Sequence, residues 1–196
     1  MKTEKQIQSP FSAMGEAFRS SALEFKKIRT LAACAMLIAL NIILDSFSIP
    51  VGNLLRIGIS FITIALAGML YGPIASMACA ALSDILCAIL IPRGAYFPGW
   101  TLGALVGGLI YGLVLYGKKV TYLRALLAKG LVNLFVNILL GTLWLSVMYG
   151  NAFIAIVGMR IAKNAGALAL EAAMIFFVGN LAQEVLRRMK KSPVKT

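Results

Sequence analysis

The chain has 196 residues, of which 60% are hydrophobic and 13% are charged. Soluble domains carry about one quarter charged residues, so this composition excludes an ordinary soluble protein and indicates one that crosses a membrane several times. We attribute the net charge of +12 to membrane orientation and attraction to lipid phosphates rather than to nucleic-acid binding.

The first 29 residues are rich in charge and lack the apolar core of a signal peptide, so we expect no cleavage. Phe11, Met14, Phe18 and Phe25 recur near a helical repeat, which is compatible with a helix that lies on the membrane surface. A flexible tail explains the same residues equally well. We therefore assign residues 1–29 to a cytoplasmic N-terminal arm and leave both interpretations open.

Apolar segments dominate the rest of the chain, and a helix of about 20 apolar residues can cross the hydrocarbon core. We predict six transmembrane helices, over residues 30–49, 57–71, 73–91, 101–116, 126–149 and 165–182. The second segment is short, so we expect an irregular outer end covered by protein or a wet cavity. The predicted fold class is an all-α integral membrane protein, with a six-helix domain over residues 30–186 and a basic tail over residues 187–196.

Lysine and arginine predict the orientation, because they concentrate on the cytoplasmic side of a membrane. With an inside N-terminus, six cations fall in the N-terminal arm, four in the stretch from Lys118 to Lys129, and five from Arg187 onward. Four cations then remain outside. This asymmetry predicts a multi-pass protein of the cell membrane with both termini in the cytoplasm.

The chain has no histidine, and its three cysteines, Cys34, Cys79 and Cys87, all fall inside predicted helices without a CxxC spacing. We therefore expect neither disulfides nor a metal site. The commonest general base is missing, so no Ser/His/Asp or Cys/His arrangement can form. An enzyme built on this chain would have to work with a few carboxylates.

Three of those carboxylates fall inside predicted helices: Asp45, Asp84 and Glu171. A charged side chain at the bilayer centre costs about 2.5–3.5 kcal/mol on insertion scales, so such residues usually face a partner or a cavity. We interpret Asp84, in the middle of its helix, as functional. Asp45 is equally compatible with the membrane interface, and Glu171 with either an ion pair to Lys163 or Arg160 or a ligand contact.

The segment IPRGAYFPGW, residues 91–100, places prolines, glycines, a cation and aromatic rings between two apolar stretches, and we interpret it as the mouth of a binding site. Arginine holds carboxylates in a bidentate fork, and aromatic rings offer flat surfaces for stacking. The outer face therefore suits an aromatic anion, although each cation alone is better explained as a solvated loop residue and each ring as an interfacial anchor. The candidates are Arg56, Arg93, Arg160 and Lys163, all in loops beside helix ends, with Tyr96, Phe97 and Trp100.

Two further pairs share a helix face. Asn137 and Trp144 are seven residues apart in the fifth predicted helix, and we expect them to line the cavity, although membrane amides also bond to neighbouring helices. In the first predicted helix, Ala35 and Ala39 form a small-xxx-small pair that lets another helix approach closely. Packing inside the bundle explains such a pair more often than an external partner does.

Several stretches resemble a known family: AMLIAL from Ala35, LRIGISFITIALAGMLYGPIAS from Leu55, SDILCAILIPRGAYFPGWTLGALVGGLIYGL from Ser83 and NILLGTLWLSVMYG from Asn137. They are similar to the substrate-binding S components of energy-coupling factor (ECF) vitamin transporters, and most similar to the folate-specific FolT group. The resemblance extends over about residues 26–186. Its most specific parts are the GxLxGP turn at residues 68–73 and the hairpin at residues 84–99.

The resemblance implies a high-affinity binding subunit without catalytic activity, cofactor or nucleic-acid partner, which captures folate outside and delivers it inward. It also implies contact through Ala35 and Ala39 with a transmembrane coupling protein, EcfT, which works with two ATPases. The chain itself has no GxxxxGK[ST] loop for ATP. Folate would lie with its pterin ring against Phe97, Trp100 or Trp144 and its N–H groups on Asp84 or an Asn amide, and with its glutamate tail near the four outer cations.

Two alternatives stay open. The first is an S component for a different vitamin, because related S components share the fold while the pocket changes. The second is a membrane enzyme or an assembly factor. An enzyme would contain a residue whose loss stops turnover but not binding, whereas an S component would bind its ligand stoichiometrically and depend on separate ATPases.

Overall fold

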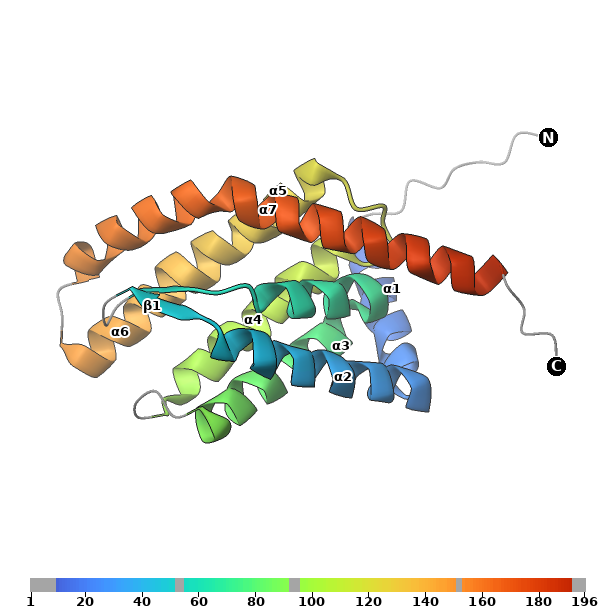
Figure 1. The fold of residues 1–196 in the computed structure, drawn as a ribbon, viewed down its shortest axis with the longest axis horizontal. Coiled ribbons are helices and arrows are strands. Elements are labelled where there is room, and N and C mark those ends of the chain that lie inside the picture. Colours follow the sequence, from blue (N-terminus) through green and yellow to red (C-terminus); the bar gives the residue numbers. More distant parts are fainter. Residues whose placement is uncertain (1–9, 52–54, 92–95, 151–152, 192–196) are drawn as a thin grey trace.

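The structure is a computed structural model that describes residues 10–51, 55–91, 96–150 and 153–191. It is almost entirely helical, and Figure 1 shows most helices running side by side, with the short hairpin at one end of the bundle and α1 at the other. The elements are α1 (Pro10–Phe25), α2 (Ile28–Ser46), β1 (Ile49–Val51), β2 (Leu55–Ile57), α3 (Phe61–Leu90), α4 (Pro98–Leu115), α5 (Tyr122–Val132), η1 (Asn133–Leu140), α6 (Gly141–Tyr149) and α7 (Phe153–Lys191).

Five helical stretches of the described residues are long and apolar enough to cross a membrane, which confirms the predicted all-α membrane fold. They are Ile28–Ser46, Phe61–Leu90, Pro98–Leu115, Tyr122–Met148 and Val157–Arg188. The short hairpin of β1 and β2 is antiparallel and pairs Ile49 with Ile57. The second predicted helix was expected to begin at Ile57 with an irregular outer end; Ile57 lies in β2, and the helix begins at Phe61.

The described residues contain five such stretches where six helices were predicted, because α3 joins the second and third predicted helices across a reversal at Gly72 (φ 86°, ψ −173°). A helix rises 1.5 Å per residue, so residues 12 apart in a straight helix would lie about 18 Å apart. Ser76 Oγ nevertheless donates a hydrogen bond of 3.0 Å to the carbonyl of Ile64, 12 residues earlier. The two halves of α3 therefore fold back on each other, and each half corresponds to one predicted helix.

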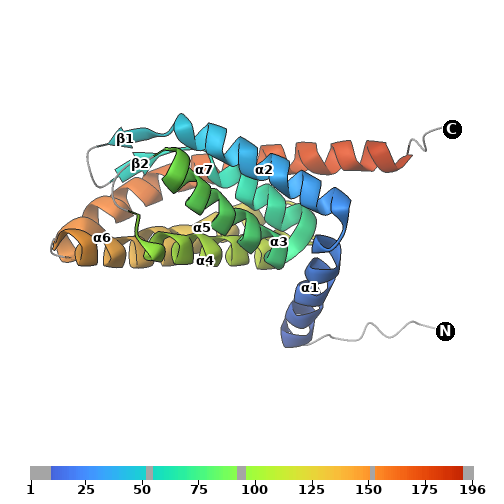
Figure 2. The same cartoon turned by 90° about the horizontal axis from the view of Figure 1, so that it is seen from below.

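The side chain of Ser21 bonds α1 to this reversal. Ser21 is fully buried, and its hydroxyl donates to the carbonyl of Tyr71 over 2.7 Å and accepts the N–H groups of Ile74 (3.1 Å) and Ala75 (3.4 Å). These N–H groups lie in the first turn of the second half of α3, where a helix lacks internal acceptors. Residues 10–25 of the N-terminal arm are thus helical and docked on the bundle, and Figure 2 shows α1 crossing its end steeply.

Glycines let α3 pack closely against α4. A Cβ atom on Gly108 would lie 2.7 Å from the carbonyl oxygen of Ser76, and one on Gly68 would lie 2.8 Å from the amide nitrogen of Gly112. Small residues bring membrane helices into such backbone contact. The buried core extends from this contact to α5 and α7 and includes Ala65, Met69, Tyr111, Leu115, Val120, Ala125, Ala128, Val132, Ala172 and Ile175.

Two predicted helices are longer than expected. The fifth begins at Tyr122 and continues through η1, a π-helical stretch of a kind that often marks functional sites. The sixth, predicted over residues 165–182, is a 39-residue helix, α7. The expectation that Arg160 and Lys163 lie in a loop was therefore wrong: both are helical, because their polarity lowers the hydropathy of the segment without interrupting the helix.

Candidate ligand-binding site

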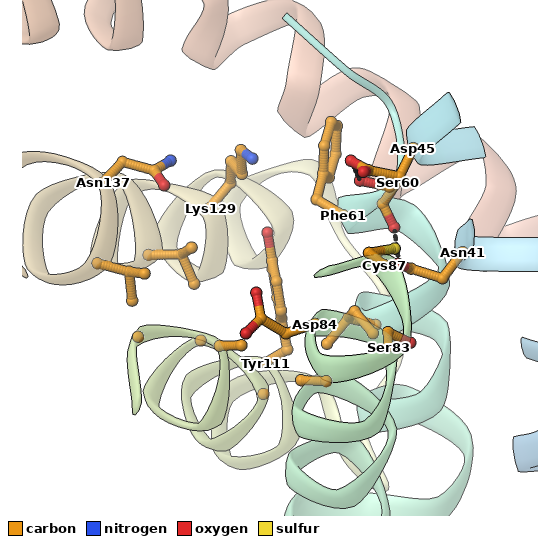
Figure 3. A pocket seen from close by; sticks show the side chains of 18 residues that line it. Asn41, Asp45, Ser60, Phe61, Ser83, Asp84, Cys87, Tyr111, Lys129 and Asn137 are labelled. Carbon is orange, nitrogen blue, oxygen red and sulfur yellow. Dashed lines mark hydrogen bonds between the residues drawn. The ribbon is translucent and has the colours of Figure 1, made fainter. Parts of the chain in front are cut away.

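A cavity of about 240 Å³ lies between α2, α3, α4, α5 and η1. Apolar side chains and the glycines of α4 form part of its wall, and Figure 3 shows the polar side chains around it. Among the described residues no group of three or more His, Cys, Asp or Glu could hold a metal ion. The polar residues that line the cavity are Asn41, Asp45, Ser60, Ser83, Asp84, Tyr111, Lys129 and Asn137.

Asp84, the carboxylate predicted to be functional, lines this cavity from the second half of α3. Its Oδ2 atom accepts a hydrogen bond of 2.6 Å from Thr101 Oγ1, which in turn lies 2.6 Å from the hydroxyl oxygen of Tyr96. This chain of hydroxyls connects the carboxylate to the start of α4. A carboxylate held in this way is an acceptor for N–H donors of a ligand.

Lys129 is a site residue that the sequence analysis missed. Its place near a helix start predicted a cytoplasmic cation, but Lys129 is only 3% exposed and lies in the cavity wall. Its Nζ atom lies 3.5 Å from Glu171 Oε1 and 3.6 Å from the centroid of the Phe61 ring. A membrane-buried ammonium requires such partners. The missed signal was periodicity, because Lys129 shares a helical face with the buried Ala125 and Val132.

Asn137 lines the cavity and also bonds to neighbouring helical turns. Its Nδ2 atom donates to Asn133 Oδ1 over 2.8 Å and to Asn164 Oδ1 over 3.3 Å. Asn133 Nδ2 donates in turn to Glu171 Oε2 over 3.1 Å. These amides join η1 to α7 and connect the cavity wall to the partner of Lys129.

Two of the four predicted outer cations, Arg160 and Lys163, lie away from the cavity wall formed by the described residues. Arg160 is half-buried in α7 and donates to the backbone carbonyl of Asn137, with its guanidinium beside Gly141. Lys163 lies on the same helix, and neither residue is among those that line the cavity. Arg56 lies in β2, and Arg93 falls outside the described residues.

The predicted aromatic residues gather at the start of α4. The ring centroids of Phe97 and Trp144 lie 5.5 Å apart, and a Cβ on Gly99 would collide with both rings. Gly99 thus makes room for their contact one helical turn from Gly103, which lines the cavity. Tyr96 and Trp100 belong to the same segment but, like Phe97 and Trp144, are not part of the cavity wall.

Ala35 and Ala39 face out of the bundle. Both are exposed on α2, whereas Cys34 and Asn41 of the same helix are buried. Met36 between them is 75% exposed. The small pair therefore lies on the outer surface of the described structure, where a further helix can approach it.

Comparison with known proteins assigns the family. Residues 29–179 match the family described as "ECF transporter, substrate-specific component". The folate transporter FolT of Clostridium novyi (strain NT) is 38% identical over 151 residues, which are 77% of this chain and 88% of that protein. FolT of Leuconostoc mesenteroides subsp. mesenteroides is 35% identical over 152 residues, 74% of this chain and 82% of that protein.

Solved structures agree with this assignment. A crystal structure of FolT bound with folic acid superposes with a TM-score of 0.73 at 33% sequence identity and covers 79% of this chain and 94% of its own. The S component for biotin from an ECF-type ABC transporter shares the fold, with a TM-score of 0.61 at 21% identity. The match covers 86% of this chain and 94% of that chain. The family is one of transporter components that bind substrate and have no catalytic activity. The chain belongs to the substrate-specific components of ECF transporters.

Proposed function

We propose that this chain captures folate in the cavity between α2, α3, α4, α5 and η1 and delivers it inward as the substrate-specific subunit of an ECF importer. The observation that carries the proposal is the half-buried carboxylate of Asp84 in the wall of the cavity, in a chain 38% identical to a folate transporter. Folate offers this carboxylate the N–H groups of its pterin ring.

The size of the cavity supports insertion of one end of folate only. Its volume of about 240 Å³ is below the roughly 300–1,000 Å³ typical of pockets that enclose a drug-sized ligand. The pterin ring therefore enters beside Asp84 and Asn137. The ring, or the part of folate between the ring and the glutamate tail, is bordered by Phe97, Trp100 and Trp144, with Tyr96.

The glutamate tail then points toward the hairpin end of the bundle. Arg56 and Arg93 are the cations that we assign to the tail, because guanidinium groups bind carboxylates in a bidentate geometry. Lys163 is a third candidate on α7. Arg160 contributes to the site indirectly, because it donates a hydrogen bond to the backbone carbonyl of Asn137 and so supports η1.

The coupling protein EcfT and two ATPases complete the importer in this proposal, and the ATPases hydrolyse the ATP. The exposed Ala35 and Ala39 on α2 provide the contact with EcfT, because small residues allow a partner helix to approach closely. Both termini lie in the cytoplasm, since exposed cations gather at one end of the bundle. Lys27 and Arg29 lie there, and Gln183 of α7 donates to the carbonyl of Lys118 at the same end.

Uptake of labelled folate tests this function. The chain is expressed with a coupling protein and two ATPases in cells that lack folate uptake, and the matched control carries an ATPase without its phosphate-binding lysine. We expect uptake that requires both the chain and active ATPases. Uptake that persists with the inactive ATPases, or folate accumulation that is the same without the chain, would contradict the proposal.

A further inference from the structure

One end of the cavity is lined by Lys129, and the ion pair of Lys129 with Glu171 is not explained by folate capture alone. We propose that Lys129, held by Glu171, is a specificity-determining contact that donates to a hydrogen-bond acceptor of an uncharged heteroaromatic ring. The same pair keeps carboxylates of the ligand out of this end. The identification of that ring as pterin rests on the proposed function.

The position of Lys129 makes it available to a ligand. Its Nζ atom is 3.5 Å from Glu171 Oε1, longer than the roughly 2.7–3.2 Å of a good N–H···O hydrogen bond. An ammonium group has three N–H donors, and the ring of Phe61 lies against one side of it. Donor capacity therefore remains toward the cavity, whose wall includes both Lys129 and Phe61.

Two buried hydroxyl groups in the cavity wall also indicate a ligand, and the one at the Lys129 end belongs to Tyr111. Tyr111 is 2% exposed and Ser83 is 3% exposed; both line the cavity, and neither hydroxyl has a hydrogen-bond partner within the described part of the chain. Figure 3 shows the Tyr111 hydroxyl directed toward the space between Lys129 and Phe61. An unsatisfied buried polar group costs about 1–3 kcal/mol, and a polar ligand atom placed there removes this penalty.

The charges around the cavity select against an anion. Lys129 and Glu171 are formally +1 and −1 and cancel each other, while Asp84 adds a negative charge to the cavity wall, as does Asp45 nearer the outer end. A ligand carboxylate would bring like charges together in a medium of low dielectric constant. A neutral ring with N–H donors toward Asp84 and an acceptor toward Lys129 satisfies both residues.

Ligand fragments and a charge-removing variant test this inference in the full chain, purified in detergent. 6-Hydroxymethylpterin supplies the ring without a carboxylate, and p-aminobenzoylglutamate supplies the tail without the ring. Lys129→Met removes the ammonium and keeps an unbranched side chain as far as Cε. It should weaken folate and 6-hydroxymethylpterin by the same factor, about 10- to 100-fold, as expected for a lost hydrogen bond to a charged group. Lys118→Met, in an exposed loop, should change neither affinity.

Two further variants separate a structural role from a selective one. Glu171→Gln leaves Lys129 uncompensated, so the affinity ratio should shift toward p-aminobenzoylglutamate; a merely structural role would weaken both fragments alike. Should Lys129→Met fail to fold because it strands the Glu171 carboxylate, the double variant Lys129→Met/Glu171→Gln contains no unpaired charge and should show the same loss of ring affinity.

Different outcomes overturn the two proposals separately. Weaker folate binding with unchanged 6-hydroxymethylpterin binding would mean that Lys129 meets a carboxylate, and this would overturn the inference but not folate capture. Unchanged binding of both ligands in Lys129→Met would also overturn the inference and leave folate capture standing. A wild-type protein that binds neither folate nor 6-hydroxymethylpterin would overturn both.

Discussion

The hydroxyl of Ser21 donates a hydrogen bond of 2.7 Å to the carbonyl of Tyr71, 50 residues further along the chain. Through this contact α1 supports the reversal in the middle of α3, from which the second half of that helix carries Asp84 to the cavity. The N-terminal helix is therefore a structural part of the ligand-binding bundle, because it holds a turn that positions the site.

Gly72→Ala should destabilise the protein, because Gly72 has φ 86° and an added Cβ would lie 2.7 Å from Ser21 Cβ. A strained backbone conformation of this kind costs about 1–3 kcal/mol, and the clash with Ser21 adds to it. Thermal unfolding in detergent measures the effect. Gly166→Ala is the matched control, since nothing lies within 4 Å of its added Cβ. Equal melting temperatures for the two variants would contradict this account of the turn.

The neighbouring glycines Gly107 and Gly108 should respond differently to alanine. A Cβ on Gly108 would lie 2.7 Å from the carbonyl oxygen of Ser76, whereas one on Gly107 would make an ordinary contact of 3.8 Å with Val136. Gly108→Ala should therefore lower the melting temperature. Gly107→Ala should keep the fold but weaken ligand binding by filling part of the cavity that Gly107 lines. Stability and affinity that change together in both variants would refute this distinction.

Thr101→Val should weaken folate binding, because it removes the hydroxyl that donates to Asp84 Oδ2 over 2.6 Å. The loss of one hydrogen bond to a charged group corresponds to about 1.5–3 kcal/mol, or roughly 10- to 100-fold in the dissociation constant. Thr101→Ser keeps the hydroxyl and should bind almost as the wild type does. Calorimetric titration compares the two. Equal affinities would show that Asp84 needs no support from Thr101.

Cys87 should be the cysteine that N-ethylmaleimide labels in the folded protein, and folate should protect it. It lines the cavity and is partly exposed, while Cys34 and Cys79 are 3% and 1% exposed. Mass spectrometry of the labelled protein locates the adduct, and Cys87→Ser provides the unlabelled control. Labelling of Cys87 at the same rate with saturating folate would argue against a ligand in this cavity.

Apolar run length was enough to predict the membrane fold, because a segment that spans lipid must be both long and apolar. Asp84 was predictable for the converse reason. A lone carboxylate inside such a run costs free energy in the membrane, so its presence indicates a function. Lys129 was not recognised, because counting cations assigns every lysine near a helix start to the interface. Its partner Glu171 lies on another helix, and no local sequence pattern connects the two.

The docking of α1 and the length of α7 were not predictable for different reasons. Ser21 acts on a turn 50 residues away, and a buried serine is indistinguishable in sequence from an exposed one. The start of α7 contains Arg160 and Lys163, which lower its hydropathy. Hydropathy indicates which residues suit a lipid environment, whereas helix formation depends on the backbone. The apolar segment therefore begins later in the chain than the helix that contains it.

The most direct test of folate capture is a titration of the purified protein with folate, thiamin, riboflavin and biotin, followed by the fluorescence of Trp100 and Trp144. We predict saturable one-to-one quenching by folate alone, and its loss in Asp84→Ala with the fold intact. Binding of a different vitamin, no binding at all, or folate affinity unchanged in Asp84→Ala would contradict the account.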